Sequence, residues 1–391
     1  MKARRVVFIV QRLGPYHHAR LGAFSEVWDG KMAVIEVRPD EEINKWGTVE
    51  AGPYRRYKTS SRRTLACTLE NYRPDVIVCT GYSDPEIHQA MEWAFKHRTP
   101  LITCSDSSEG DKRRRVPKEL FKRVLIGGFN AGLVAGTRSR EYLTSLGMDS
   151  GRIFQPWDVV DNDHFSRSTP YAEERCGELR RKLGLAGDCF LFVGRFVREK
   201  NLDRLLASYA IYANRVLPQP WPLLLVGAGG LETFLKRQVN EMRLGSLVRF
   251  CGHADYHDLP SYYAMTSALV LSSVSETWGL VVNEAMAAGL PVLVSTRCGC
   301  APDLVQEGRN GFLFDPENVQ GLAALMVRLH RTNPERRREM GRRSREIIAG
   351  YSPEAFACGL TAAVGCALED EGRRKSLVTR LAVRVLAGRR P

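Results

Sequence analysis

The sequence has 391 residues, more than one ordinary hydrophobic core supports, and therefore predicts two domains of nearly equal size. Hydrophobic residues make up 44% and charged residues 26%, a globular composition that excludes extensive disorder. The net charge of +13 indicates an anionic partner, which by charge alone is a nucleotide, a lipid headgroup or a nucleic acid.

In the first half, short β-branched runs alternate with helical patterns, which predicts a parallel sheet covered by helices. The expected strands are residues 5–10, 32–37, 75–79, 100–104 and 132–136. The apolar run Val6–Val10 is too short for a signal peptide, so we interpret it as a buried strand.

The second half repeats this alternation, with strands expected at residues 189–194, 222–227, 247–252, 267–272 and 290–295. We therefore predict an α/β protein with domains at 1–170 and 171–352, joined by a linker near 165–175. A helical segment at 353–391 is expected to return to the first domain. Its apolar stretch 355–368 is shorter than the ~20 residues that span a bilayer, so we expect a cytoplasmic, non-spanning protein.

The ten cysteines are scattered, several of them inside apolar strand-like runs, so we expect no disulfide framework. Cys298 and Cys300 form a C-x-C pair without a second pair or a nearby histidine cluster, and we expect no metal site there. The basic runs at 112–115, 336–345 and 373–390 lack the interleaved aromatic residues of single-strand binders, so we expect no nucleic-acid partner.

A strand-to-helix turn within residues 267–295 suits a phosphate ligand. The helix predicted to begin near Leu280 leaves the amides of Trp278, Gly279 and Leu280 at its N-terminus, where backbone donors and the helix dipole favour an anion. Gly279 has no side chain to hold a ligand away from the turn.

Two carboxylates flank this turn, Glu276 and Glu284. At ~1.5 Å rise per residue, Glu284 lies about 7 Å along the helix and would reach a ribose whose diphosphate caps the helix. Glu276, on the loop side, would face a sugar. The alternative is a capping acid and a solvated helix glutamate.

Two cations, Arg195 and Lys200, follow the strand predicted at 189–194. They would neutralise the charge that develops on a diphosphate leaving group, the task of Mg²⁺ in metal-dependent enzymes. Taken alone, the same loop also fits two surface cations.

Together these residues resemble family 4 glycosyltransferases (glycosyl transferases group 1), which are retaining enzymes. The motifs are G-R-x₄-K-N at 194–201, V-G-x-G at 226–229, V-R-F-x-G at 248–252, S-E-x-x-G-L-V-x-x-E-A-x-A-x-G-x-P-V at 275–292 and G-x-x-G-F-L-F at 308–314. The resemblance covers nearly all of residues 186–352 and is much weaker over 1–170. It implies the GT-B fold, two Rossmann-like domains facing each other across a cleft.

The resemblance implies that Arg195 and Lys200 hold the donor phosphates, that Glu284 binds the ribose and that Glu276 binds sugar hydroxyls. The other implied donor contacts are Gly14, Gly194, Gly227, Phe250, Cys251, Trp278, Gly279 and Leu280. The implied activity is a metal-independent hexosyltransferase that retains anomeric configuration. It uses a nucleotide diphosphate sugar as co-substrate and no cofactor.

The first domain departs from the family pattern. Many relatives carry a histidine after the fourth strand, whereas TCSDSSEG stands here, with Asp106, Ser107 and Glu109. Asp106 and the first-loop residues His17 and His18 are the candidates for the catalytic role, and the choice among them stays open.

Two other functions fit parts of this pattern: a nucleotide-sugar epimerase of the same fold and a non-catalytic basic adaptor at a membrane. A dinucleotide-binding dehydrogenase is disfavoured because Glu232 occupies the place of the third glycine in G-x-G-x-x-G. The acceptor is expected to be a glycan, a lipid-linked molecule or a small molecule. Contact of residues 112–123 with anionic lipid at the inner face of a membrane is a further hypothesis.

Overall fold

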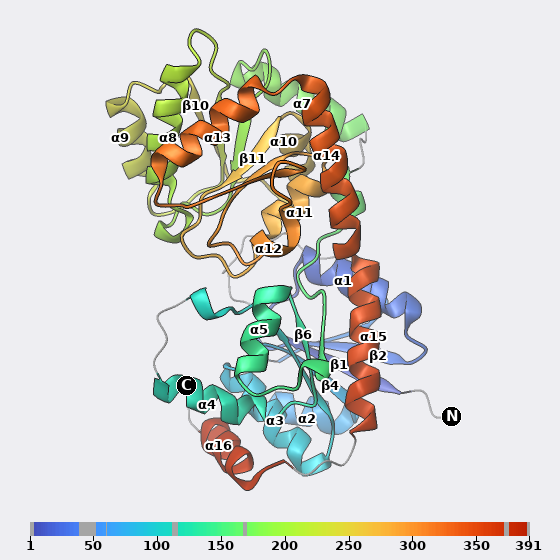
Figure 1. Ribbon diagram of the computed structural model, residues 1–391. Helices are drawn as coiled ribbons and strands as arrows, with labels where there is room; N and C mark the ends of the chain where they lie inside the picture. Colours follow the sequence, from blue (N-terminus) through green and yellow to red (C-terminus); the bar gives the residue numbers. More distant parts are fainter. Residues whose placement is uncertain are drawn as a thin grey trace. The chain divides into compact units, whose positions relative to one another are not determined.

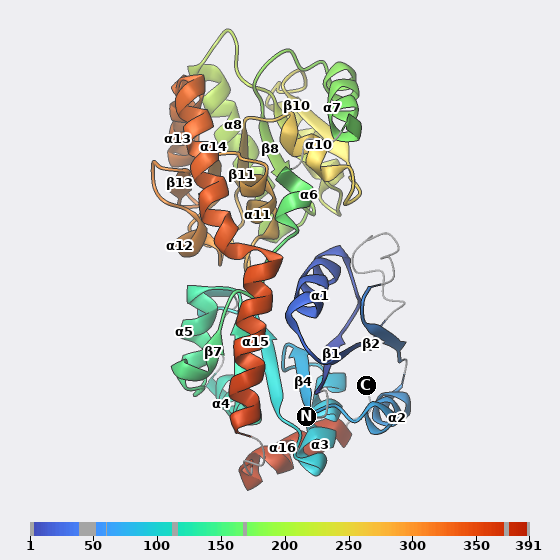
Figure 2. The same cartoon turned by 90° about the vertical axis from the view of Figure 1, so that its right-hand side faces the viewer.

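The computed structural model describes residues 4–38, 52–59, 61–111, 116–166, 170–370 and 375–388. The chain forms two compact units (Figures 1 and 2). Unit 1 comprises Met1–Val159 with Pro353–Pro391, and unit 2 comprises Val160–Ser352. The division thus falls at Val159, before the position 170 expected from the sequence. The basic run at 112–115 lies outside the described residues.

The sheet of unit 1 is entirely parallel, in the order β3-β2-β1-β4-β5-β6-β7. Its strands are β1 (Arg5–Val10), β2 (Lys31–Glu36), β3 (Arg55–Lys58), β4 (Val76–Thr80), β5 (Leu101–Ser105), β6 (Ala131–Val134) and β7 (Ile153–Phe154). The two edge strands, β3 and β7, were not predicted from the sequence. β3 reads RRYK and is largely exposed, and β7 has two residues, so neither carries a run of buried apolar residues.

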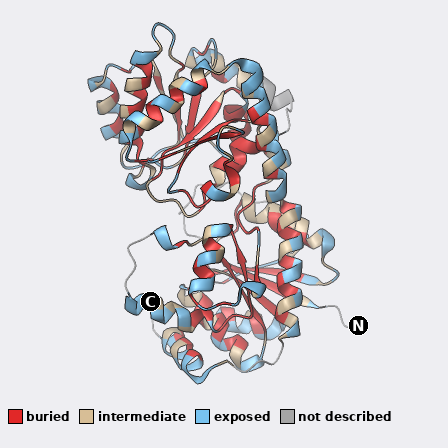
Figure 3. Cartoon of the chain, in the orientation of Figure 1, coloured by how far each residue is buried: buried red, intermediate tan, exposed pale blue. Residues whose placement is uncertain are grey.

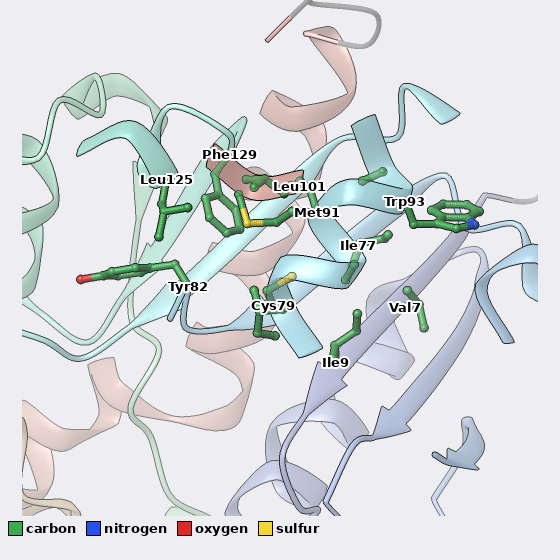
Figure 4. Packing of buried hydrophobic residues seen from close by; sticks show 14 of the residues in the cluster. Val7, Ile9, Ile77, Cys79, Tyr82, Met91, Trp93, Leu101, Leu125 and Phe129 are labelled. Atoms are coloured by element: carbon green, nitrogen blue, oxygen red, sulfur yellow. The ribbon is translucent and has the colours of Figure 1, made fainter. Parts of the chain in front are cut away.

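Helices cover both faces of this sheet. They are α1 (Pro15–Val27), α2 (Arg62–Tyr72), α3 (Pro85–His97), α4 (Val116–Ile126), α5 (Thr137–Ser145), α15 (Pro353–Glu369) and α16 (Leu377–Gly388), with short 3₁₀ turns η1 (Glu109–Asp111) and η2 (Ser150–Arg152). Alternate residues of the strands, such as Val7 and Ile9 or Ile77 and Cys79, point into one core (Figure 4). Side chains from α2, α3, α4, α5 and α16 complete this core, which includes Met91, Leu125 and Val383.

The last part of the chain belongs to unit 1. Helix α15 packs against α1 and the strands β4 to β7, and it buries residues such as Phe356 and Leu360. The continuous helical run Pro334–Glu369 is long and apolar enough by composition to cross a bilayer, a test that the core helix of a globular domain also meets. In this structure the apolar face of α15 lies in the core of unit 1.

The sheet of unit 2 is also parallel, in the order β10-β9-β8-β11-β12-β13. Its strands are β8 (Phe190–Val193), β9 (Leu223–Val226), β10 (Val248–Gly252), β11 (Ala268–Leu271), β12 (Val292–Ser295) and β13 (Gly311–Phe314). The elements around them are α6 (Asn162–Ser166), α7 (Pro170–Leu183), η3 (Arg198–Lys200), α8 (Leu202–Arg215), α9 (Glu232–Glu241), α10 (Leu259–Ala264), α11 (Leu280–Ala287), α12 (Ala301–Leu304), α13 (Val319–Arg331), α14 (Pro334–Ile348) and η4 (Ala349–Tyr351).

The prediction of a linker at residues 165–175 was wrong, because α6 ends at Ser166 and α7 begins at Pro170. The side chain of Asp161 caps α6 by accepting a hydrogen bond from the His164 amide at 2.9 Å. Proline favours the first helical turn, which fits the start of α7. The polar residue Asp161 therefore serves as a helix cap.

The strand order reverses direction at β8 in unit 2. The chain proceeds from β8 to β9 and β10 on one side and then returns to place β11 on the other side of β8. In open parallel sheets, ligands bind outside the carboxyl ends of the strands at such a reversal. The loops that follow β8 and β11 are therefore the position at which the fold of unit 2 favours a ligand.

Candidate active site

The two clusters of charged residues predicted from the sequence follow the two strands at this reversal. Arg195 and Lys200 come after β8, and Glu276 comes after β11. The strands are hydrogen-bonded neighbours, with Phe190 opposite Ala268. Parallel neighbours end at the same edge of the sheet, so two segments about eighty residues apart in sequence meet there.

Lys200 and Glu276 form an ion pair across this edge, and their side chains are only 14% and 17% exposed. The hydroxyl of Ser273 donates a second hydrogen bond to the same carboxylate oxygen of Glu276, at 2.9 Å. Arg195 lies in the same loop as Lys200 but is exposed, and its guanidinium forms no ion pair with any residue that the structure describes. The loop thus presents one oriented cation and one cation available to an anion.

Hydrogen bonds from the Asn201 side chain stabilise the loop that carries Lys200. Asn201 adopts a left-handed conformation, with φ of 56°, and is only 3% exposed. Its amide group donates to the carbonyl oxygens of Ser272 at 3.2 Å and Pro316 at 2.9 Å. Ser272 in turn donates from its hydroxyl to the Lys200 carbonyl oxygen, at 2.8 Å. Asn201 stands within a sequence motif, but no role was predicted for Asn201, Ser272 or Ser273 from the sequence.

Helix α11 begins at Leu280, as predicted, and Gly279 precedes it with φ of 109°. A side chain at Gly279 would be strained by this backbone conformation and would approach Leu271 at 3.0 Å. The amides of Trp278, Gly279 and Leu280 donate to no acceptor in the described part of the chain. The indole of Trp278 is buried and donates a hydrogen bond to the Asn283 side chain at 2.9 Å. A ligand at this turn could therefore contact the Trp278 backbone amide but not its ring.

Glu284 is buried, with 1% exposure, and accepts a hydrogen bond from the Tyr263 hydroxyl at 2.5 Å. No side chain caps α11 through a hydrogen bond. The alternative of a capping acid and a solvated helix glutamate is therefore wrong. The contact between Glu284 and a ribose stays a prediction.

Glycines allow the strand ends of unit 2 to approach closely. Gly227 has φ of 136°, and a Cβ atom there would lie 1.9 Å from the carbonyl oxygen of Gly194. Gly194 also donates from its amide to the Val226 carbonyl oxygen at 3.0 Å. Both glycines therefore allow the close backbone contact between the ends of β8 and β9, next to the loop that carries Arg195.

Phe250 and Cys251 lie at the end of β10, where the pairing with β9 shifts register. The Lys236 ammonium lies 5.5 Å from the centre of the Phe250 ring, and burial raises the pKa of the Cys251 thiol to about 11. Both side chains are half-buried, and their contact with the donor stays a prediction.

In unit 1 the first loop is held by a buried carboxylate. Gly14 precedes α1, and its amide donates to Nδ1 of His17 at 3.4 Å. Glu36, which is 1% exposed at the end of β2, accepts a hydrogen bond from the Leu13 amide at 3.1 Å and pairs with Arg56. Glu36 was not predicted as a site residue, because its position at a strand end was its only signal in the sequence.

The candidates for the role of the family histidine lie in unit 1 in different surroundings. Burial, reinforced by the charge of Arg20, lowers the pKa of His17 from 6.5 to about 3, so its imidazole is neutral at neutral pH. Nδ1 of His18 lies 3.0 Å from the Tyr54 hydroxyl. Asp106 is half-buried after β5, and its carbonyl oxygen accepts a hydrogen bond from Ser139 at 3.0 Å.

A buried ion pair that the sequence analysis did not predict stands beside His17. The Arg20 guanidinium lies 3.3 Å from the Asp158 carboxylate and donates to the Val159 carbonyl oxygen from two nitrogens. Its central carbon also lies 4.6 Å from the centre of the Trp157 ring. The pair joins α1 to residues distant in sequence, so spacing along the chain gave no sign of it.

Cys298 and Cys300 form no disulfide and are fully buried. They belong to the segment that packs behind the Glu276 loop, where the Cys300 amide donates to the Trp278 carbonyl oxygen at 3.2 Å. Burial raises the pKa of the Cys300 thiol well above its usual range. These cysteines therefore act as small core residues.

Comparison with known proteins points to one family. Residues 178–347 match the family described as glycosyl transferases group 1. The chain is 30% identical over 270 residues to the D-inositol 3-phosphate glycosyltransferase of Corynebacterium urealyticum, covering 67% of this chain and 62% of that protein. It is 34% identical over 297 residues to the protein of the same name from Thermobifida fusca, covering 72% of this chain and 66% of that protein.

Solved structures extend the similarity over both units. Anabaena HepE, in complex with UDP and glucose, superposes with a TM-score of 0.73 at 17% identity and covers 93% of this chain and 99% of its own. Sucrose-phosphate synthase from Thermosynechococcus elongatus superposes with a TM-score of 0.69 at 20% identity, covering 93% and 98%. At these identities the likeness shows the fold. The two parallel α/β sheets and the family match in unit 2 lead to one conclusion: the chain belongs to the group 1 glycosyl transferases and has the GT-B fold.

Proposed function

We propose that this chain is a retaining glycosyltransferase that moves a hexose from a nucleotide diphosphate sugar to a hydroxyl acceptor without a metal ion. The observation that carries the proposal is the Lys200–Glu276 ion pair at the strand-order reversal of unit 2, beside the exposed Arg195. This position is where parallel sheets bind ligands, and its charges match a diphosphate and a polyhydroxylated sugar.

In the proposed reaction the bond between the anomeric carbon and the phosphate oxygen breaks, and its electron pair stays on the nucleoside diphosphate. Lys200, Arg195 and the amides that open α11 stabilise the added negative charge, because fixed cations and dipoles act strongly in a half-buried site. The acceptor oxygen bonds to the anomeric carbon and passes its proton to the departing phosphate oxygen. Glu276 holds Lys200 in place before the donor binds and accepts hydrogen bonds from sugar hydroxyls afterwards.

The names of the relatives support the same class of reaction. The two D-inositol 3-phosphate glycosyltransferases are named as transferases, and HepE binds UDP and glucose. We therefore propose UDP-sugars as the first donors to test. For the acceptor we keep three classes, a glycan, a lipid-linked molecule and a small molecule. We further propose a cytoplasmic enzyme that meets the inner face of a membrane peripherally.

A donor screen followed by product analysis tests the proposal. The purified chain is heated with a panel of nucleotide sugars, and any that raise the melting temperature are incubated with candidate acceptors for mass spectrometry. A transferase releases nucleoside diphosphate slowly even without acceptor and forms a glycoside when the acceptor is present. A product that is an epimer of the donor would point to the epimerase instead. A chain that binds no nucleotide sugar would favour the basic adaptor.

A further inference from the structure

Exposed apolar side chains gather on two helices of unit 1 that pack against each other. Among the described residues, the large hydrophobic side chains with high exposure on α4 and α16 are Val116, Leu120, Phe121, Leu377, Val378, Leu381 and Val385. Three others belong to other elements, with Val27 on α1, Leu217 in the segment after α8 and Phe234 on α9. Figure 3 shows the exposure of α4 and α16, and a cluster of this kind marks an interaction surface more often than single exposed residues do.

Helix α16 is apolar on two opposite faces. Thr379, Val383 and Ala387 recur every four residues and are buried against unit 1. A second series, Leu377, Leu381 and Val385, is offset by two residues, about 200° around the helix, and is more than half exposed. The inner face already packs on α3 and α4, so the outer apolar face is not needed to hold the helix.

Contacts at its N-cap and first turn fix α16 in this orientation. The hydroxyl of Ser376 accepts a hydrogen bond from the Thr379 amide at 3.0 Å and thus caps the helix. The Thr379 hydroxyl donates to the Val124 carbonyl oxygen of α4 at 3.1 Å. The outer apolar face of α16 is therefore a defined surface rather than a fraying end.

The charge on these two helices is almost entirely positive. Helix α16 has two arginines and no acidic residue, and Arg380 and Arg384 are both exposed. Helix α4 adds the exposed Lys118 and Arg123, and its one acid, Glu119, is engaged by Lys122 at 2.9 Å. An apolar stripe flanked by exposed cations matches an anionic lipid surface.

A basic hollow of about 490 Å³ adjoins this surface. It is lined by the end of α3 and by Arg380 of α16, and its cations include Lys96, Arg98 and Lys375. Lys96, Arg98 and Arg380 form no ion pair with any residue in the described ranges. The acid in the lining, Asp370, is already paired with Arg152 at 2.6 Å. The hollow therefore offers positive charge to a phosphate group.

We propose that α16, together with α4, docks on the surface of an anionic phospholipid bilayer, with the basic hollow facing the headgroup phosphates. Leu377, Leu381 and Val385 enter the interfacial region, while Arg380 and Arg384 reach the phosphates beside it. This inference deepens the proposed peripheral location by naming its surface. Its test measures vesicle binding and not turnover, so its failure leaves the transferase assignment unaffected.

Vesicle sedimentation of the full chain tests the docking surface. We expect the protein to sediment at low salt with vesicles that mix phosphatidylglycerol into phosphatidylcholine, and to remain free with phosphatidylcholine alone. The double variant Leu381→Gln/Val385→Gln should weaken binding about tenfold or more. The double variant Arg380→Gln/Arg384→Gln should weaken it about tenfold or more as well, at about fivefold for each arginine near the surface.

Matched variants elsewhere serve as controls. Phe234→Gln removes an exposed apolar side chain on α9, and Arg338→Gln/Arg342→Gln removes two exposed cations on α14. Both should sediment like the original protein, and all variants should keep its melting temperature because the changed side chains are exposed. Absence of vesicle binding by the original protein, or equal binding by the α16 variants, would overturn the proposal. So would a dimer in light scattering that Leu381→Gln/Val385→Gln converts to a monomer without a change in vesicle binding.

Discussion

Lys200 and Glu276 depend on each other in the structure, and the proposed reaction uses them in different ways. Replacing Glu276 by alanine removes the carboxylate that binds the sugar hydroxyls and leaves Lys200 without its ion-pair partner. Replacing Lys200 removes a positive charge that stabilises the departing diphosphate. We expect each change to lower kcat/KM for donor hydrolysis by about 100-fold, which corresponds to ~2.7 kcal/mol of transition-state stabilisation. The measurement is release of nucleoside diphosphate from the donor found in the screen.

The control for this pair is another lysine–glutamate pair in the same unit. Glu232 and Lys236 lie one turn apart on α9, 2.7 Å from each other and more exposed. Glu232→Ala should change neither turnover nor melting temperature appreciably, because exposed pairs contribute little. Normal turnover in a folded Glu276→Ala protein would contradict the role given to that carboxylate.

His17 gives unit 1 a pH dependence of stability. Its folded pKa, about 3, lies below the ordinary value of 6.5, so below pH 6.5 the unfolded chain binds a proton that the folded chain does not. The contribution of His17 to the free energy of unfolding should therefore fall as the pH falls from 6.5 towards 3. Between pH 6.5 and 5 the loss from this residue should be on the order of 1–2 kcal/mol.

Urea unfolding at several pH values measures this effect. His17→Gln should remove this contribution over that range, and His253→Gln, which changes a more exposed imidazole in unit 2, serves as the control. An identical pH slope in the original and the His17→Gln proteins would show that this imidazole is not kept neutral by burial.

At the scale of elements, the segment after β12 supports the Glu276 loop from behind. The Gly299 amide donates to the Glu276 carbonyl oxygen at 2.9 Å, and a Cβ atom at Gly299 would lie 1.8 Å from the Thr277 carbonyl oxygen. Gly299→Ala must therefore push the two segments apart. We expect a loss of about 1–3 kcal/mol in the free energy of unfolding, with reduced turnover.

Thermal and urea unfolding, with donor turnover beside them, measure this change. Gly245→Ala is the matched control, because a Cβ atom there meets nothing within 4 Å. If Gly299→Ala were as stable and as active as the original protein, the close packing behind the Glu276 loop would be of no consequence.

The elements that could be predicted from the sequence are those that contain a run of buried apolar residues. The central strands β1, β4 and β5 were found within one residue at each end, and so was the start of α11 at Leu280. The edge strand β3 was missed because its polar side chains carry no such run, and β13 was quoted in a motif without being read as a strand. The helix at Pro170 was mistaken for a linker because capping residues and loop residues are the same types.

The site was predictable in part for a similar reason. Arg195, Lys200 and Glu276 stand in motifs, but their meeting depends on β11 pairing with β8 after β9 and β10 have been placed. The spacing of residues along the chain does not predict that strand order. The supports Asn201 and Ser273 act through backbone carbonyls and a carboxylate brought close only by folding, so they have no local signal either.

At the scale of the whole molecule, the two units carry different functional features. Unit 2 carries the family match and the loops at the strand-order reversal, whereas unit 1 carries the apolar and basic face of α4 and α16. This division fits a transferase in which unit 2 provides the donor site and unit 1 adapts to the acceptor and its location. That assignment depends on the donor diphosphate binding to unit 2.

Titration calorimetry of UDP into the full chain and into Arg195→Ala/Lys200→Ala tests this claim most directly, with GDP and ADP titrated in the same way. We predict that at least one nucleoside diphosphate binds the original chain and that the double variant binds it at least about tenfold more weakly, ~1.4 kcal/mol or more. Equal affinity in a folded double variant, or no binding of any of the three nucleotides to the original chain, would contradict the account.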